Sequence, residues 1–165
     1  MTEKKTEALK WIAKILNDNG ISYRVGGGMA TNLYGSGRPV NDIDISISGV
    51  SFLDIIPLVK DCISAGPKHY QNEKWDCVTL SLNYEGQDID LTDADTLLMK
   101  KKDGSEWIKN REIYQKYPDV IKDVEGIKIS LMDSRVLLEY KRELDGDHQK
   151  FDRDFLEKYI NSETH

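Results

Sequence analysis

Apolar residues along this chain change between helical and strand spacing, and each stretch predicts one element. Over residues 3–18 they recur every third or fourth position, which predicts an amphipathic helix. A short strand is expected over 21–25, followed by three glycines at 26–28 and one or two helical turns over 29–34. Over residues 42–48 isoleucines alternate with aspartates and serines, which predicts a strand with one apolar and one polar face.

The remainder of the chain repeats this mixture of helices and strands. The expected elements are, in order, a helix over 55–65 ended by Gly66-Pro67, a hairpin over 78–91, a lysine-rich region of helix and loop, a hairpin over 120–129, and two helices over about 134–144 and 151–159. The apolar stripe of the last helix is expected at Phe151, Phe155 and Tyr159. Together they predict the α/β (α+β) class, with a mixed, mainly antiparallel sheet, helices packed against it and two C-terminal helices. We expect one domain over residues 1–165, with its core at about 20–130 and its helical part at about 132–161.

Composition and charge favour a folded protein that binds neither DNA nor membranes. The chain has 165 residues, of which 39% are hydrophobic and 32% charged, enough to bury a core without disulfides. Its formal net charge of −6 argues against broad, charge-driven binding of nucleic acids, so no DNA partner is expected. No apolar run is typical of a signal peptide or a membrane span, so we expect a cytoplasmic protein.

Two local features have simple structural interpretations. Cys62 and Cys77 stand in apolar surroundings without the paired spacing of zinc or redox sites, so we expect buried free thiols. The run of lysines at 100–102 is the one candidate for a basic binding site, and a solvated loop is the commoner explanation of such a run.

Two carboxylates, Asp42 and Asp44, share the polar face of the strand predicted over 42–48. Positions i and i+2 on a strand point the same way with Cα atoms about 6.5 to 7 Å apart, close enough to share a divalent ion. Mg²⁺ prefers such oxygen ligands and completes its shell with waters and substrate phosphates. A third carboxylate from the next acidic strand, Asp90 or Asp88, could bind a second ion or take a proton.

The glycine-rich segment before this strand offers groups suited to phosphate. Gly27, Gly28 and Thr31 lie where backbone N–H groups and the positive end of a short helix would meet phosphate oxygens. The guanidinium of Arg38, in the following loop, can reach a triphosphate. A dinucleotide-binding motif is excluded because Thr31 replaces its third glycine, and neither a P-loop nor an EF-hand pattern is complete.

The order of these features in GGMATNLYGSGRPVNDIDISI resembles the nucleotidyltransferase superfamily of polymerase-beta-like folds. That pattern is two small residues, a spacer, and Asp-hydrophobic-Asp-hydrophobic, and it is most similar to small lincosamide and aminoglycoside adenylyltransferases and toxin-type nucleotidyltransferases. Ile89-Asp90-Leu91 resembles the third carboxylate of this family, so the resemblance prefers Asp90 to Asp88.

The end of the chain resembles the same family more loosely. Toxin-like branches carry a helix with a lysine and then Arg-x-Lys-Asp/His-x-x-Asp, and LLEYKRELDGDHQKFDRDFLEKY resembles this arrangement. Lys141 and Asp154 match it, whereas His148 stands where Arg is usual and Phe151 where Asp or His is usual.

The resemblance implies the nucleotidyltransferase fold and a Mg²⁺-dependent transfer of a nucleoside monophosphate from a nucleoside triphosphate to an acceptor hydroxyl, with release of pyrophosphate. In this reading Asp42, Asp44 and Asp90 are catalytic and hold one or two Mg²⁺ ions, and the nucleotide contacts are Gly27, Gly28, Thr31, Arg38, Lys141 and Asp154. The acceptor stays open between a small molecule and, as for a toxin-like enzyme, RNA or protein. A third alternative is a nucleotide-binding or protein-interaction module of this fold without turnover.

Overall fold

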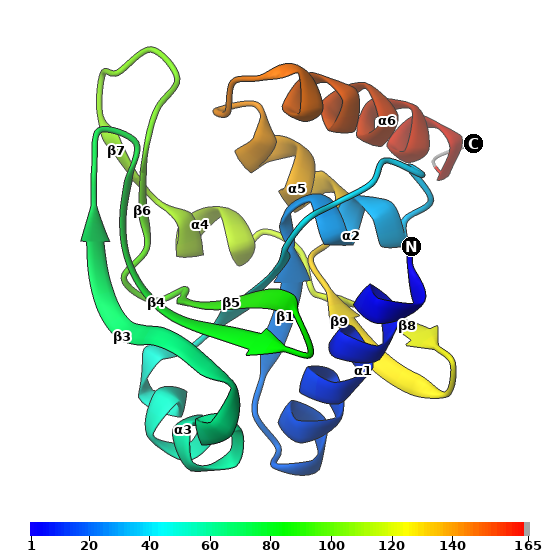
Figure 1. Cartoon of the computed structure of the whole chain (residues 1–165). Helices are drawn as coiled ribbons and strands as arrows, with labels where there is room; N and C mark the ends of the chain where they lie inside the picture. The colour runs from blue at the N-terminus through cyan, green and yellow to red at the C-terminus, as the bar shows by residue number, and fades with distance from the viewer. Residues whose placement is uncertain (164–165) are drawn as a thin grey trace.

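Helices flank one strongly curved sheet in the computed structural model of this chain, which describes residues 1–163 (Figure 1). The helices are α1 (Glu3–Asp18), α2 (Gly27–Leu33), α3 (Phe52–Val59), α4 (Asn110–Tyr114), α5 (Ser134–Lys141) and α6 (Asp147–Glu163), with short 3-10 turns η1 (Gly49–Ser51) and η2 (Lys60–Cys62). The strands are β1 (Tyr23–Gly26), β2 (Ile43–Ile47), β3 (Ile63–Gln71), β4 (Trp75–Tyr84), β5 (Gln87–Asp93), β6 (Leu98–Lys100), β7 (Trp107–Lys109), β8 (Val120–Val124) and β9 (Ile127–Leu131).

The sheet is mixed and mainly antiparallel, which confirms the predicted fold class. Within the described residues its strand order is β7-β6-β4-β5-β2-β1-β9-β8, and β3 pairs with β4 outside this path. Only the β2–β5 and β1–β9 pairs are parallel. The helix α2 lies between β1 and β2 on one side and α5 and α6 on the other, whereas α1 packs against β5 and β9. None of the helices described is long and apolar enough to cross a lipid bilayer.

The predicted alternation along β2 is confirmed and defines the two faces of the central sheet. Ile43, Ile45 and Ile47 are buried in the hydrophobic core, because the period of two sends them all to one face. The same period leaves Asp44 and Ser46 on the opposite face. The strand that carries the core residues therefore also presents polar groups to the other side of the sheet.

The predicted helix over 55–65 is wrong in its second half. The helix α3 ends at Val59, and after one 3-10 turn the chain enters the strand β3. Gly66-Pro67 lies inside this strand at a shift of register against β4. Gly66 has φ +82°, and a Cβ atom there would lie 2.4 Å from the carbonyl oxygen of Thr79. Pairing with the next strand, β4, thus makes a strand of a segment whose own residues are mostly exposed.

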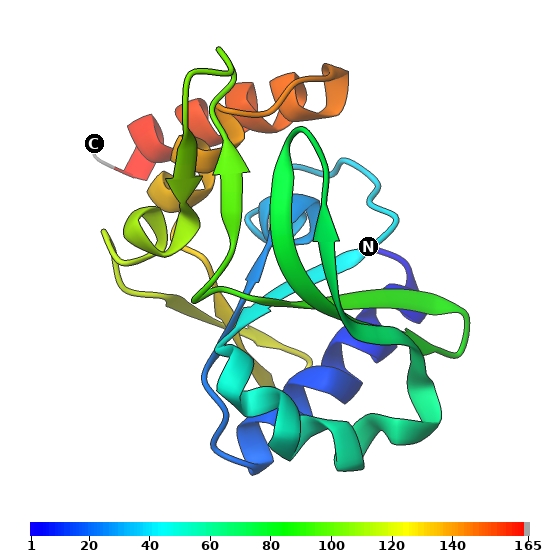
Figure 2. The same ribbon diagram turned by 90° about the vertical axis from the view of Figure 1, so that its left-hand side faces the viewer.

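The lysine-rich region also contains strands that the sequence analysis does not predict. Its short strands β6 and β7 pair with each other, and β6 extends the sheet from β4. Figure 2 shows this hairpin in yellow-green beside the β3–β4 hairpin in green. Two of its lysines have carboxylate partners: Lys101 contacts Glu106, and Lys102 contacts Asp145 in the segment between α5 and α6.

The last part of the chain follows the prediction closely. The strands β8 and β9 form the expected hairpin, with Glu125 and Gly126 at positive φ in its turn. The helix α5 ends earlier than expected, at Lys141, and α6 follows. Cys62 and Cys77 are free, as expected, but each is only partly buried.

Candidate active site

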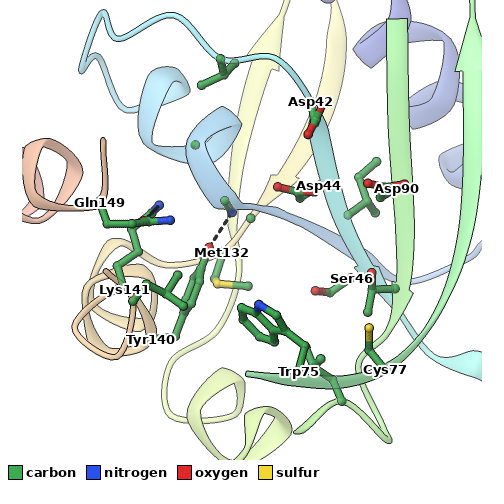
Figure 3. Close-up of a pocket in the computed structure, with 18 of the residues that line it drawn as sticks. Asp42, Asp44, Ser46, Trp75, Cys77, Asp90, Met132, Tyr140, Lys141 and Gln149 are labelled. Atoms are coloured by element: carbon green, nitrogen blue, oxygen red, sulfur yellow. Dashed lines mark hydrogen bonds between the residues drawn. The ribbon is translucent and has the colours of Figure 1, made fainter. Parts of the chain in front are cut away.

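A pocket of about 520 Å³ opens on the polar face of the central sheet. Its walls come from β1, α2, the segment before β2, the strands β2, β4 and β5, and the two C-terminal helices (Figure 3). The residues that line it are Gly26, Gly27, Gly28, Arg38, Val40, Asn41, Asp42, Asp44, Ile45, Ser46, Trp75, Cys77, Thr79, Asp90, Thr92, Leu97, Tyr114, Met132, Tyr140, Lys141, Leu144, His148 and Gln149.

Three aspartates face one another at one side of this pocket, and we call Asp42, Asp44 and Asp90 the carboxylate cluster (Figure 3). The parallel register of β2 and β5 sets Asp44 directly beside Asp90. Asp90 is also held by Ser81, whose hydroxyl donates a hydrogen bond of 2.7 Å to Oδ1. Asp88 lies outside this pocket and accepts a hydrogen bond from Asn83. The strand register thus brings Asp90, rather than Asp88, to Asp44.

The carboxylate cluster concentrates negative charge, and the pKa values of two members show it. The carboxylate of Asp44 faces the pocket, and protein surrounds it on its other sides. This burial is the largest cause that raises the pKa of Asp44 to about 6, and the charges of Asp90 and Asp42 add to it. Burial and the charges of Asp90 and Asp88 also raise the pKa of Asp42. A bound cation would relieve this repulsion, so the oxygen donors fit Mg²⁺ chemically. Within residues 1–163, however, no three His, Cys, Asp or Glu side chains are already arranged as a metal site.

The two glycines predicted from the sequence allow α2 to pack tightly against the cluster. Gly27 has φ +59°, and a Cβ atom there would lie 2.5 Å from Oδ2 of Asp44. A Cβ atom on Gly28 would lie 2.5 Å from Nη2 of Arg38. The N–H of Gly27 donates a 2.8 Å hydrogen bond to the hydroxyl of Tyr140, so this amide is already occupied. The helix begins at Gly27, two residues earlier than expected, because the glycines form its first turn.

A buried ion-pair network braces the opposite wall of the pocket. Asp152 on α6 has no exposed side-chain surface and accepts two hydrogen bonds from Arg38, at 2.8 Å from Nε and 2.7 Å from Nη2. Nζ of Lys141 lies 3.0 Å from the same carboxylate and 2.8 Å from Oε1 of Gln149. Burial lowers the pKa of Lys141, while Asp152 acts against this shift. One carboxylate therefore fixes both predicted cations.

Two predicted nucleotide contacts lie away from the pocket lining. Thr31 is buried, and its hydroxyl lies 3.4 Å from the carbonyl of Gly27 one helical turn earlier. Asp154 is on the exposed side of α6, where it pairs with Lys150. The structure thus brings Gly27, Gly28, Arg38, Lys141 and the carboxylate cluster together, and leaves these two outside.

Several residues of the site escape the sequence analysis. Asp152 stands one turn before the buried Leu156, and this spacing marks the inner face of α6; Phe151, which we assigned to that face, is 49% exposed. Tyr140 and Trp75 carry no recognisable motif, because their positions depend on contacts between distant segments.

Comparisons with known proteins support the fold. No protein-family model and no curated protein sequence matches this chain. A candidate nucleotidyltransferase from Thermotoga maritima has a similar structure, with a TM-score of 0.72, 17% identity, and coverage of 98% of this chain and 96% of that one. ANT(2″)-Ia, solved in complex with adenylyl-2″-tobramycin, has a TM-score of 0.57 and 12% identity over 99% of this chain and 92% of that one.

A third structure, an antigenic nucleotidyltransferase-like protein from Paracoccidioides brasiliensis, agrees with these two. It has a TM-score of 0.55 and 14% identity, and the match covers 95% of this chain and 75% of that one. Since identities are low throughout, the similarity concerns the path of the chain. The chain has the nucleotidyltransferase fold, as the resemblance in its sequence implies.

Proposed function

Because this chain has the nucleotidyltransferase fold, we propose that it is a Mg²⁺-dependent enzyme that transfers a nucleoside monophosphate from a nucleoside triphosphate to an acceptor hydroxyl. The observation that carries this proposal is the register of β2 and β5, which sets Asp44 beside Asp90 in one pocket with Asp42 and Lys141. Carboxylates that converge from two strands on a pocket with a buried lysine suit the transfer of a phosphoryl group.

The three aspartates of the carboxylate cluster have distinct roles in this proposal. Asp42 and Asp44 hold one or two Mg²⁺ ions, and Asp90, oriented by Ser81, accepts the proton of the acceptor hydroxyl. When bound, Mg²⁺ neutralises triphosphate charge and polarises the α-phosphorus. The acceptor oxygen forms a bond to the α-phosphorus. The bond between the α-phosphorus and the oxygen that bridges it to the β-phosphorus breaks, and its electron pair leaves with pyrophosphate.

The opposite wall supplies positive charge. Lys141 lines the pocket with its ammonium group held between Asp152 and Gln149, so its positive charge is fixed in position before a phosphate arrives. Gly28 and Arg38 border the same space, and we propose that the triphosphate lies against them. Thr31 and Asp154, which the sequence analysis predicts as nucleotide contacts, do not line the pocket, so we give them no contact with the nucleotide in this proposal.

For the acceptor we favour a small molecule. ANT(2″)-Ia, which shares the fold, was solved with an adenylylated aminoglycoside, and the net charge of −6 of the present chain opposes binding of RNA. A toxin-like enzyme that modifies RNA or protein is the first alternative, and a binding module without turnover is the second. We also propose that the protein acts in the cytoplasm, where nucleoside triphosphates are abundant.

The test is calorimetric titration of Mg²⁺–nucleoside triphosphates, with pyrophosphate release followed in the same samples. The wild type should bind at least one triphosphate, and Asp42→Asn/Asp44→Asn should not. Asp90→Asn should still bind the triphosphate, but its rate of pyrophosphate release should fall by about 100-fold or more, because it lacks the proton acceptor. Asp88→Asn is the matched control on the same strand and should change both properties much less, because Asp88 lies outside the pocket and acts on Asp42 through its charge alone.

Each other outcome selects a different account. If the wild type binds triphosphate but releases no pyrophosphate with any acceptor tried, including RNA, the module without turnover is the better description. If Asp88→Asn slows pyrophosphate release and Asp90→Asn does not, the third carboxylate of the site is Asp88. If the wild type binds no triphosphate with Mg²⁺, the enzymatic proposal is wrong.

A further inference from the structure

Two parts of the pocket differ sharply in chemistry. One side holds the carboxylate cluster, and Trp75, Cys77 and Met132 lie away from Asp42 in the same pocket (Figure 3). Leu97 and Leu144 add further apolar surface to the lining. We propose that Trp75 is the platform on which the nucleobase of the triphosphate stacks, an inference that rests on the function proposed above.

The indole of Trp75 lines the pocket and packs in part against the hydrophobic core. The other two tryptophans have ring partners, since Trp11 stacks on Tyr84 with ring centroids 4.4 Å apart and Trp107 lies beneath the ammonium of Lys100 at 5.1 Å. Among residues 1–163, no ring or cation is recorded against the Trp75 indole, and its Nε1 has no hydrogen-bond partner. An aromatic ring that lines a pocket without a partner suits a planar ligand.

The backbone around Trp75 is fixed before any ligand binds. Its N–H donates a 2.8 Å hydrogen bond to Oδ1 of Asn72, and its carbonyl accepts one of 2.9 Å from the N–H of the same residue. Nζ of the adjacent Lys74 donates to the carbonyls of Lys100 and Glu143, which joins the end of the β3–β4 hairpin to the segment after α5. The backbone of the platform is thus joined to the segment after α5, and it needs no rearrangement when a ring binds.

The position of these apolar residues favours the nucleobase over a ring on the acceptor. Leu144 follows Lys141 by three residues, and both line the pocket. The carbonyl of Glu143, next to Leu144, accepts a hydrogen bond from Lys74, next to Trp75, so the wall proposed to meet phosphate is joined to the platform. A nucleotide whose phosphates lie between Lys141 and the carboxylate cluster can extend its base along this wall. Stacking does not depend on the identity of the base, because every base offers a π-face. The platform should therefore add affinity for any of the bases.

The test compares a nucleoside triphosphate with inorganic tripolyphosphate, each titrated with Mg²⁺ into the whole chain. Trp75→Ala should weaken nucleoside triphosphate binding about tenfold or more and leave tripolyphosphate binding unchanged, because only the first ligand carries a ring. Trp75→Phe should restore most of the lost affinity. Trp107→Ala, which removes a partly exposed tryptophan outside the pocket lining, should change neither affinity.

Four outcomes would overturn the inference, and they separate it from the function. If Trp75→Ala weakens both ligands equally, the side chain is merely structural. If it weakens neither but raises the KM for an aromatic acceptor, the platform serves the acceptor. If the wild type releases pyrophosphate yet binds both ligands equally well, the base makes no stacking contact and only this inference fails. If the wild type binds neither ligand, the proposed function fails with it.

Discussion

Replacing Asp152 with asparagine tests the ion-pair network that braces the pocket. The carboxylate is fully buried and lies within hydrogen-bond distance of both Arg38 and Lys141. An asparagine fits the same space but leaves the two cations close together without a counter-charge. The side chain of Lys141 is only 2% exposed, so water cannot replace the lost carboxylate there.

The size of the effect follows from the exposure of the two cations. Removing one member of a buried ion pair typically costs about 3 to 5 kcal/mol of folding free energy. The side chain of Arg38 is 20% exposed and can gain some hydration, so we expect Asp152→Asn near the lower limit, about 3 kcal/mol. For a chain of this length, such a loss lowers Tm by roughly 6 to 12 °C.

The same network predicts a dependence on pH. Burial alone would raise the pKa of Asp152, but the hydrogen bond from Arg38 and the charge of Lys141 outweigh it, and the pKa is lowered. A carboxyl with a lowered folded pKa adds stability that is complete above its unfolded pKa of about 3.9 and is lost as the pH falls through the folded value. The stability difference between wild type and Asp152→Asn should therefore be constant near neutral pH and shrink below about pH 4.

The assay is urea denaturation of both proteins at several pH values, with thermal unfolding beside it. Asp154→Asn is the matched control, because it lies two residues away on the same helix but is exposed and pairs only with Lys150. It should leave the free energy of unfolding nearly unchanged. Equal stability of the two variants at neutral pH would refute the role given to Asp152.

Two further predictions concern contacts of the glycine turn. Gly27→Ala should abolish binding of Mg²⁺–triphosphate, because the new Cβ would displace the carboxylate of Asp44. Gly37→Ala is the control, since Gly37 also has a positive φ but has open space around it. Calorimetry should show that this control variant binds Mg²⁺–triphosphate normally. Tyr140→Phe should cost about 1 to 3 kcal/mol in urea denaturation, because the N–H of Gly27 loses its acceptor. Burial raises the pKa of Tyr140 well above its usual range, so this cost should not change with pH near neutrality, and a cost that does change would contradict the assignment.

The front of the site could be predicted because its signals are local. Strand alternation places Asp42 and Asp44 on the face opposite the isoleucines whatever the rest of the chain does. Choosing Asp90 over Asp88 from the residues alone was not possible, because that choice depends on which residue of β5 lies beside Asp44. Register belongs to the pairing of two strands, and no single strand specifies it.

The part of the site formed by α6 could not be predicted with the same accuracy, because the buried face of a helix is sensitive to small errors in its assigned positions. At 3.6 residues per turn, a one- or two-residue error turns a side chain from the core to solvent. The apolar stripe of α6 was assigned through Phe151, which is 49% exposed, and the polar position was assigned to Asp154. The structure instead buries Asp152 with Leu156, and a buried carboxylate is recognisable only once its two cations are in place.

The charges of the pocket connect this network to the proposed chemistry. Arg38 and Lys141 are the cations at its edge, but both already share the carboxylate of Asp152, so neither offers a full unpaired charge to a ligand. Among residues 1–163 the carboxylate cluster opposite them has no ion-pair partner, and burial together with the neighbouring carboxylates raises the pKa values of Asp42 and Asp44. A triphosphate alone would add further negative charge to this site, and its approach would be opposed. The nucleotide should therefore bind only together with divalent cations, and the network serves to hold Lys141 in position rather than to attract phosphate by net charge.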